Sequence, residues 1–211
     1  MSAIYEQLST AVLEGDAARA HQVTAKGIEE GLSPKGILDN GLIVGMNEVG
    51  VRFKRGDMFV PEVLMSAEAM QAGLAIIRPL LLAGGVKLIG KIVFGTVKGD
   101  LHDIGKNLVA MMMEGAGFEI NDLGVDVKPE QFVEAVKSGS GVVALSALLT
   151  TTMPAMKDTI EALKAENVRD KAVVIIGGAP VTQNYADEIG ADGYAPDAAS
   201  AVDKAKELLK I

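Results

Sequence analysis

The hydrophobic periodicity of the chain changes near residue 84, and this change constrains the possible folds more than any other feature. Before that point, apolar residues recur at steps of three and four, as Ile4, Leu8 and Val12 do, and no stretch alternates like a half-buried strand. After it, short β-branched apolar runs alternate with helical stretches. The sequence therefore predicts two regions of different architecture, residues 1–86 and residues 87–211.

The first region is predicted to form four helices. They cover residues 2–14, residues 17–30, a stretch that begins at Pro34, and residues 61–83. Ser33 fits the N-cap position of the third helix, and Pro34 fits its first helical position. The segment "FKRGDMFV" is expected to be a loop. Four helices with short connections are typical of a bundle.

The second region contains five short apolar runs, which are "LIGKIVFGTV", "FEINDLGV", "GVVALSAL", "KAVVIIGGA" and "ADGYAP". Helical stretches follow at residues 104–117, 129–138, 152–166, 181–189 and 197–209. This alternation of nearly all-apolar strands with helices predicts a parallel sheet covered on both faces. The expected fold class is therefore α/β, with a four-helix bundle followed by a flavodoxin-like, Rossmann-type domain of five strands. Ligands of such folds bind at the carboxyl ends of the strands.

Composition excludes several classes of function. The net charge is −8 and no run of Lys and Arg forms a basic stripe, so nucleic acid and anionic membranes are not expected as partners. The absence of cysteine excludes disulfides, thiolate metal sites and a cysteine nucleophile. The N-terminus lacks the pattern of a signal peptide, and the apolar stretch "LAIIRPLLLAGGV" is interrupted by Arg78 and Pro79. A cytoplasmic protein is expected.

The segment "GDLHDIG", residues 99–105, follows the first predicted strand and contains His102, one of two histidines. Asp100 precedes it by two residues, so the two side chains start on the same side of an extended loop. A carboxylate that holds one imidazole nitrogen leaves the other free for a metal. Because no second histidine or cysteine is near, His102 suits a metal that a cofactor already holds. The residue types alone fit equally well a solvated loop in which Asp103 caps the next helix.

Hydroxyls and glycines follow two further strands. Ser146, Thr150, Thr151 and Thr152 come at the end of the third strand, where one threonine is enough to cap the next helix. Four hydroxyls in seven residues exceed that need. The pair Gly177–Gly178 ends the fourth strand and fits either a simple turn or the close approach of a flat ligand group to the backbone.

Together these residues resemble the cobalamin-binding module of methionine synthase and of the small corrinoid proteins of methyltransferase systems. The family pattern D-x-H-x-x-G, then S-x-L, then G-G is matched by Asp100, His102 and Gly105, by Ser146 and Leu148, and by Gly177 and Gly178. The stretch "MNEVGVRFKRGDMFVPEVLMSAEAM" resembles the helical cap that precedes this module in methyl-transferring members.

The resemblance implies cobalamin or a related corrinoid as cofactor, with His102 as the lower axial ligand of cobalt. It also implies that Asp100 holds the other imidazole nitrogen and that Thr152 extends this relay. The further contacts that it implies are Ser146, Thr150, Gly177 and Gly178 beside the nucleotide tail, Gly99, Leu101 and Asp103 at the corrin edge, and Ala198. Phe53 and Val60 would cover the upper face, where the family often has leucine in place of Val60.

The expected function is that of a methyl carrier, which accepts a methyl group on cobalt from a substrate-specific methyltransferase. It would deliver that group to a second methyltransferase acting on tetrahydrofolate or coenzyme M, and a reductive activator is expected as a further partner. No stand-alone catalysis is expected, and the methyl donor is left open among methanol, methylamines, glycine betaine and aryl methyl ethers. The helical cap is expected to move about the hinge "AGGVK". The alternatives are a subunit of an adenosylcobalamin-dependent mutase, a cobalamin-dependent regulator, and a flavodoxin-like domain with an incidental Asp/His loop.

Overall fold

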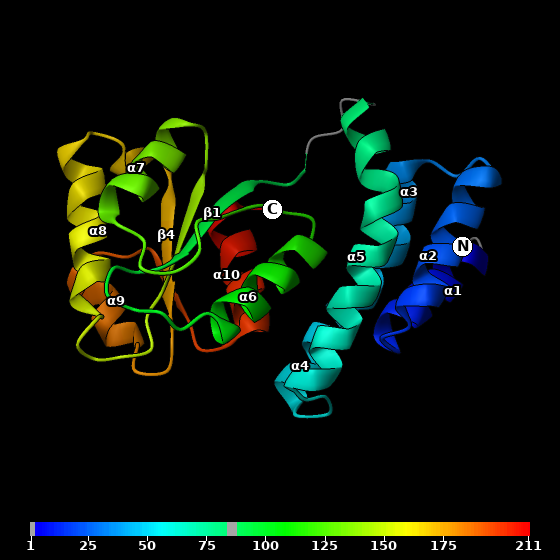
Figure 1. Cartoon of the computed structure of the whole chain (residues 1–211), viewed down its shortest axis with the longest axis horizontal. Helices are drawn as coiled ribbons and strands as arrows, with labels where there is room; N and C mark the ends of the chain where they lie inside the picture. The colour runs from blue at the N-terminus through cyan, green and yellow to red at the C-terminus, as the bar shows by residue number, and fades with distance from the viewer. Residues whose placement is uncertain (1–2, 84–87) are drawn as a thin grey trace. The chain divides into compact units, whose positions relative to one another are not determined.

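The computed structural model describes residues 3–83 and 88–211, and the chain divides into two compact units (Figure 1). One is formed mainly by the residues before 89 and the other mainly by residues 89–211. The expected domain boundary between residues 86 and 87, and most of the expected hinge "AGGVK", lie outside the described residues.

The first unit is helical. Its elements are α1 (Ala3–Leu13), α2 (Ala17–Glu29), α3 (Pro34–Ile37), the π-helical turn η1 (Leu38–Leu42), α4 (Ile43–Arg55) and α5 (Val60–Ala83). The third expected helix is therefore the uninterrupted series α3, η1 and α4. Its predicted start is confirmed, because the Ser33 hydroxyl accepts a hydrogen bond of 3.0 Å from the Gly36 N–H and Pro34 follows at the first helical position.

The expected loop "FKRGDMFV" was predicted too long. Helix α4 continues through Phe53 to Arg55 and ends at Gly56, whose φ of 76° closes the helix in the left-handed conformation. Glycine adopts this conformation without a steric penalty, so Gly56 and not the preceding basic residues determines the helix end. Helix α5 begins at Val60, one residue before Pro61.

Helix α5 is the longest element of the helical unit. By length and composition alone, residues 60–81 could cross a membrane. Of the 18-residue window that meets this criterion, 44% is buried. Val63, Ala67, Met70 and Ile77 are buried at helical spacing, and α5 packs along α2. A core helix of a bundle has the same properties, so these features are weak evidence for a membrane segment.

The second unit is a five-stranded parallel sheet with helices on both faces. The strands are β1 (Lys91–Thr96), β2 (Glu119–Asp122), β3 (Val142–Ser146), β4 (Val173–Gly177) and β5 (Gly193–Ala195). The other elements are α6 (Ile104–Gly115), α7 (Pro129–Lys137), α8 (Pro154–Ala165), the short 3₁₀ helix η2 (Arg169–Lys171), α9 (Gln183–Ile189) and α10 (Ala198–Leu209). Figure 1 shows α7, α8 and α9 on one face of the sheet and α6 and α10 on the other.

The strand order is β2-β1-β3-β4-β5, and all neighbours are parallel. The order reverses between β1 and β3, so the loops that follow these two strands diverge and leave room for a ligand. The register places Thr96 beside Ser146 and Ser146 beside Gly177. The last residues of β1, β3 and β4 therefore form one row at the carboxyl edge of the sheet. This arrangement confirms the expected fold class.

Candidate functional site

The loop between β1 and α6 begins with a tight turn that directs Asp100 inward. Gly99 has a φ of 83°, which suits glycine, and the Asp100 N–H donates to the Val97 carbonyl at 3.1 Å. Asp100 is fully buried even though it carries a carboxylate. Such burial is costly unless the charged group is hydrogen-bonded, so the partners of Asp100 determine whether it stays ionised.

Four hydrogen bonds satisfy the Asp100 carboxylate. Oδ1 lies 2.7 Å from His102 Nδ1 and accepts the His102 backbone N–H at 3.1 Å. Oδ2 accepts the Thr152 hydroxyl at 2.7 Å and the Leu148 backbone N–H at 2.8 Å. Burial raises the pKa of Asp100, but the hydrogen bonds from Thr152, Leu148 and His102 together outweigh it and hold the pKa well below its usual value. The group is therefore a carboxylate at neutral pH.

His102 presents one ring nitrogen for a ligand. Because the anionic Asp100 can only accept at Oδ1, Nδ1 of the neutral ring carries the proton and Nε2 keeps its lone pair. The His102 side chain is 51% exposed, so Nε2 is available to a group outside the domain. Among the described residues, no three His, Asp or Glu side chains are placed to hold a metal ion together. A metal at Nε2 would therefore need its other ligands from a cofactor.

Thr152 does not have the capping role that its position before a helix allowed. Helix α8 begins at Pro154 with no side-chain hydrogen bond at its N-cap, Met153. The Thr152 hydroxyl lies 2.7 Å from Asp100 Oδ2 and 2.9 Å from the Leu149 carbonyl. Its single proton goes to the charged acceptor, because charge-assisted hydrogen bonds are the stronger ones. Thr152 is thus the far end of a relay that runs through Asp100 to His102.

The glycine pair at the end of β4 allows two backbones to approach closely. Gly178 has a φ of 132°, and a Cβ at this position would lie 1.9 Å from the Ala147 carbonyl oxygen. At Gly177 a Cβ would lie 3.1 Å from the Ala195 carbonyl oxygen. Of the two, Gly178 is the one that no other residue can replace without moving the loop after β3.

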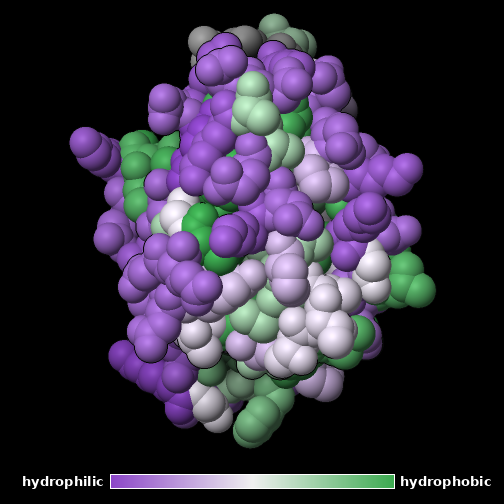
Figure 2. All heavy atoms as spheres, turned by 90° about the vertical axis from the view of Figure 1, so that its left-hand side faces the viewer, coloured by the Kyte–Doolittle hydropathy of each residue, from purple (hydrophilic) through white to green (hydrophobic). Residues whose placement is uncertain are grey.

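Exposed apolar side chains lie in or next to the loops that follow β1 and β3, at the carboxyl edge of the sheet. Leu101 and Ile104 are 71% and 76% exposed, and Leu148 and Leu149 are also exposed. In Figure 2, whose near side is the sheet unit, most of the view is hydrophilic, and a group of white and green residues lies in its lower part. An exposed imidazole with one free ring nitrogen, a glycine held against a neighbouring loop and exposed apolar residues in the adjoining loops fit a large, flat, metal-containing cofactor.

The comparisons with known proteins agree with this chemistry. Two family models, each described as a B12 binding domain, match residues 90–203 and residues 4–78. Dimethylamine corrinoid protein 1 of Methanosarcina acetivorans is 49% identical over 98% of this chain and 97% of its own. A corrinoid protein of Desulfitobacterium hafniense is 44% identical over 98% of this chain and 97% of its own. The chain belongs to the B12-binding family of corrinoid proteins.

Solved structures of this family support the same assignment. The methanol:cobalamin methyltransferase complex MtaBC from Methanosarcina barkeri matches with a TM-score of 0.88 and 31% identity, over 99% of this chain and 80% of that one. A cobalamin-binding protein from Desulfitobacterium hafniense DCB-2 matches with a TM-score of 0.80 and 34% identity, over 96% and 97%. The expected cofactor, cobalamin or a related corrinoid, is confirmed. The expected class, a corrinoid protein of a methyltransferase system, is also confirmed.

Sequence reasoning missed two residues that bond to the loop between β1 and α6, which carries His102. The buried Thr96 hydroxyl donates to the His102 carbonyl at 2.7 Å. Asp126, in the loop after β2, accepts the Gly99 N–H at Oδ1 across 2.7 Å, and its own N–H donates to the Asp100 carbonyl at 2.9 Å. Thr96 could have been noticed as a polar residue at the end of an apolar strand. Asp126 gave no signal of comparable strength.

The remaining predicted site residues have different surroundings. Ser146 is half-buried at the end of β3, Thr150 is exposed in the following turn, and a Cβ at Gly105 would meet nothing within 4 Å. Asp103 is exposed, and its Oδ2 accepts from Asn107 Nδ2 at 3.3 Å. Ala198 is buried at the start of α10, so its side chain offers little surface.

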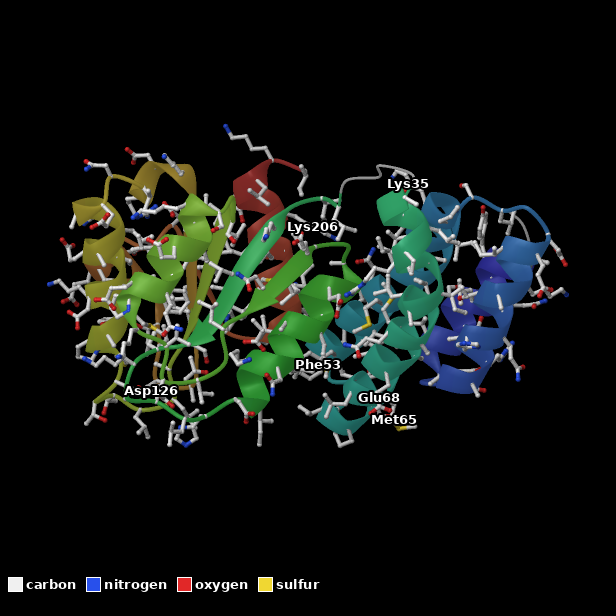
Figure 3. All side chains as sticks on the ribbon, turned by 45° about the horizontal axis from the view of Figure 1, so that its top comes forward. Lys35, Phe53, Met65, Glu68, Asp126 and Lys206 are labelled. Atoms are coloured by element: carbon white, nitrogen blue, oxygen red, sulfur yellow. The ribbon has the colours of Figure 1, made fainter. Side chains whose placement is uncertain are left out.

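Phe53 and Val60 belong to the helical unit. Phe53 lies on α4 and is half-buried (Figure 3), and Val60 is the first residue of α5 and is 38% exposed. Phe53 is therefore held by a helix and not by the loop that the sequence suggested. Their expected contact with the upper face of the corrinoid stays a prediction.

Proposed function

We propose that this chain is a corrinoid methyl carrier, which receives a methyl group from one methyltransferase and delivers it to another. The observation that carries the proposal is the fully bonded Asp100 carboxylate, which holds Nδ1 of an exposed His102 and leaves Nε2 for cobalt. The bound corrinoid would supply the cobalt that carries the methyl group. His102 would hold that cobalt through Nε2, and Asp100 and Thr152 would keep the ring in place.

The relay from Thr152 through Asp100 would control how strongly His102 binds cobalt. Asp100 fixes the ring orientation and the tautomer, and a carboxylate partner raises the basicity of a ligating imidazole. Thr152 and the Leu148 N–H donate to the other carboxylate oxygen and hold the charge on Asp100 in place. The relay thus holds the His102 ring in one orientation and one tautomer, with Nε2 towards the metal that the cofactor would bring.

The names of the similar proteins suggest which partners to test. We expect a substrate-specific methyltransferase as methyl source, and the proposed acceptor is a methyltransferase acting on tetrahydrofolate or coenzyme M. Dimethylamine is the first methyl source to test, because Dimethylamine corrinoid protein 1 is 49% identical over nearly the whole chain. Methanol is the second methyl source to test, because a chain of the methanol:cobalamin methyltransferase complex MtaBC is similar in structure. A reductive activator and a cytoplasmic location stay predictions.

The helical unit favours a methyl carrier over the alternatives. A family model described as a B12 binding domain matches residues 4–78 of this unit, in addition to the match over the sheet domain. The corrinoid proteins that are 49% and 44% identical align over both units. A mutase subunit would prefer adenosylcobalamin, whereas a methyl carrier should accept methylcobalamin or the cofactor without an alkyl group.

The first test is reconstitution of the cofactor-free protein with hydroxocobalamin. We expect an absorption spectrum in which the cofactor's own base has left the cobalt and a protein imidazole has replaced it. His102→Ala should lose the signature of the protein imidazole, and His21→Ala should keep it, because His21 is the only other histidine and lies exposed on α2. An unchanged hydroxocobalamin spectrum on mixing would contradict the proposal.

The second test is methyl transfer. The reduced, reconstituted protein is incubated with a dimethylamine-dependent or a methanol-dependent methyltransferase and the matching substrate, and methylation is followed by absorption. Methylation with either enzyme supports the carrier function and identifies the methyl source. Stable retention of adenosylcobalamin in preference to methylcobalamin, without methylation by any donor enzyme, would indicate a mutase subunit instead.

A further inference from the structure

The loop that carries His102 is attached to the next loop of the sheet edge through Asp126. Asp126 Oδ1 accepts the Gly99 N–H at 2.7 Å, and the Asp126 N–H donates to the Asp100 carbonyl at 2.9 Å. The two bonds hold both ends of the Gly99–Asp100 peptide segment from one residue. Figure 3 shows Asp126 among the loops at one end of the sheet domain.

The backbone of Asp126 is unusual for a residue with a side chain. Its φ is 52°, and in the described part of the chain only Asn167 and Lys210 share a positive φ among residues other than glycine. The left-handed backbone conformation costs more energy for aspartate than for glycine. A contact of the Asp126 side chain should therefore offset this cost. The contact that glycine could not make is the hydrogen bond from Gly99 to Oδ1.

The same loop supports β1 at two further points. The Thr96 N–H donates to the Gly124 carbonyl at 3.0 Å, and the Val127 N–H donates to the Thr96 carbonyl at 3.0 Å. The segment from Gly124 to Val127 thus extends the pairing of β1 with β2 beyond the strand ends. Within residues 124–127, all of them described, only the Asp126 side chain bonds to the loop that carries His102.

We propose that Asp126 is a positioning residue for the axial ligand, which fixes the Gly99 turn and thereby holds Asp100 and His102 in the geometry that binds cobalt. The inference rests on the proposed function. Asp126 does not touch His102, so its effect acts through the Gly99–Asp100 backbone. Without this bond the turn at Gly99 can relax, and His102 then has to be ordered when the cofactor binds, which weakens axial ligation.

The test uses two substitutions that separate the side chain from the backbone. Asp126→Gly keeps the left-handed conformation and removes the acceptor, whereas Asp126→Asn keeps an Oδ1 acceptor and tolerates the same φ. Asn167→Gly is the matched control, because it makes a similar change at a φ of 55° just after α8, outside the loops that hold His102 and Asp126. Glycine and asparagine both tolerate these angles, so all three variants are expected to fold.

Two readouts are measured, one with and one without the cofactor. In the cofactor-free protein, exchange of the Gly99 amide hydrogen should be about tenfold faster in Asp126→Gly than in wild type, the scale of losing one hydrogen bond to a charged acceptor. In the reconstituted Asp126→Gly variant, the ratio of His102-bound to His102-free cobalamin, measured by absorption, should be about tenfold lower than in wild type. Asp126→Asn should lie within about threefold of wild type in both, and Asn167→Gly should match wild type.

The outcomes distinguish this inference from the proposed function. If wild type shows His102-dependent binding and Asp126→Gly equals wild type in both readouts, the positioning role is wrong and the proposed function stands. If Asp126→Gly exchanges faster at Gly99 but binds His102 to cobalt as wild type does, the bond is structural only and the inference is wrong. If wild type itself shows no His102-dependent spectrum, the proposed function fails and the inference fails with it.

Discussion

The Thr152 hydroxyl donates to Asp100 Oδ2 across 2.7 Å, although 52 residues separate the two in sequence. The bond joins the loops that follow β1 and β3, the two strands between which the order of the sheet reverses. Asp100 uses its other oxygen to hold His102. Removing the Thr152 hydroxyl should therefore change how strongly His102 binds cobalt.

Replacing Thr152 by valine removes the hydroxyl and keeps a similar shape. The Asp100 carboxylate then loses one of its four donors, so we expect the free energy of unfolding to fall by about 1–2 kcal/mol. The proportion of His102-bound cobalamin should also fall. Thr152→Ser, which keeps the hydroxyl, should restore both quantities in large part. A valine variant that matches wild type, beside a serine variant that does not, would show that Thr152 acts through packing alone.

Replacing Asp100 by asparagine removes the charge that supports His102. The amide can accept at one atom only, so either the His102 side or the Thr152 side of the residue loses its acceptor. We expect the affinity of His102 for cobalt to fall about 10- to 100-fold, the range found when a partner of a metal-binding histidine is removed. Titration of cofactor-free protein with cobalamin, followed by absorption, gives this ratio. His21→Ala serves as a control on which no effect is expected.

The same carboxylate should make the cofactor-free protein sensitive to acid. The pKa of Asp100 is lowered from its ordinary value of 3.8, so the ionised group stabilises the fold at pH values above that ordinary value. This contribution is lost as the pH falls below about 4 towards the pKa of the folded state. Urea unfolding of wild type and Asp100→Asn between about pH 7 and pH 3 should therefore show a difference in stability that shrinks with acid. A difference that grows in acid would contradict the assignment of Asp100 as a carboxylate.

The two adjacent glycines at the end of β4 should respond differently to substitution by alanine. Gly178→Ala places a Cβ 1.9 Å from the Ala147 carbonyl oxygen at a φ of 132°, so the loop after β3 has to move. We expect a loss of roughly 3 kcal/mol or more in the free energy of unfolding, together with weaker cobalamin binding. Gly177→Ala meets its nearest atom at 3.1 Å and should cost less. Thermal unfolding and cobalamin titration of both variants make the comparison.

The main features of the fold could be predicted from sequence because they depend on local patterns. Nearly all-apolar runs separated by helical stretches predicted the five strands in order, and the i, i+2 spacing of Asp100 and His102 predicted the contact between them. The end of α4 was placed wrongly, since the basic residues before Gly56 look like a loop although they continue the helix. The π-helical turn η1 left no pattern that distinguishes it from an α-helix.

The remaining contacts of the site depend on strand order and backbone angles, which sequence reasoning alone does not supply. Thr152 was assigned to the relay through the resemblance, because its residue type suited a helix cap equally well. Asp126 reaches Gly99 only because β2 lies beside β1 and because its φ is 52°. Thr96 reaches the His102 carbonyl only because the loop folds back over the end of its own strand.

The most direct test of the account is the identity of the nitrogen bound to cobalt. Protein labelled with ¹⁵N-histidine in a His21→Ala background carries the label only at His102. It is reconstituted with unlabelled cobalamin, and the electron paramagnetic resonance spectrum of the cobalt(II) form is recorded. If His102 is the axial ligand, the nitrogen splitting should change from the triplet of ¹⁴N to the doublet of ¹⁵N. A triplet that persists, or a spectrum without axial nitrogen splitting, would contradict the account.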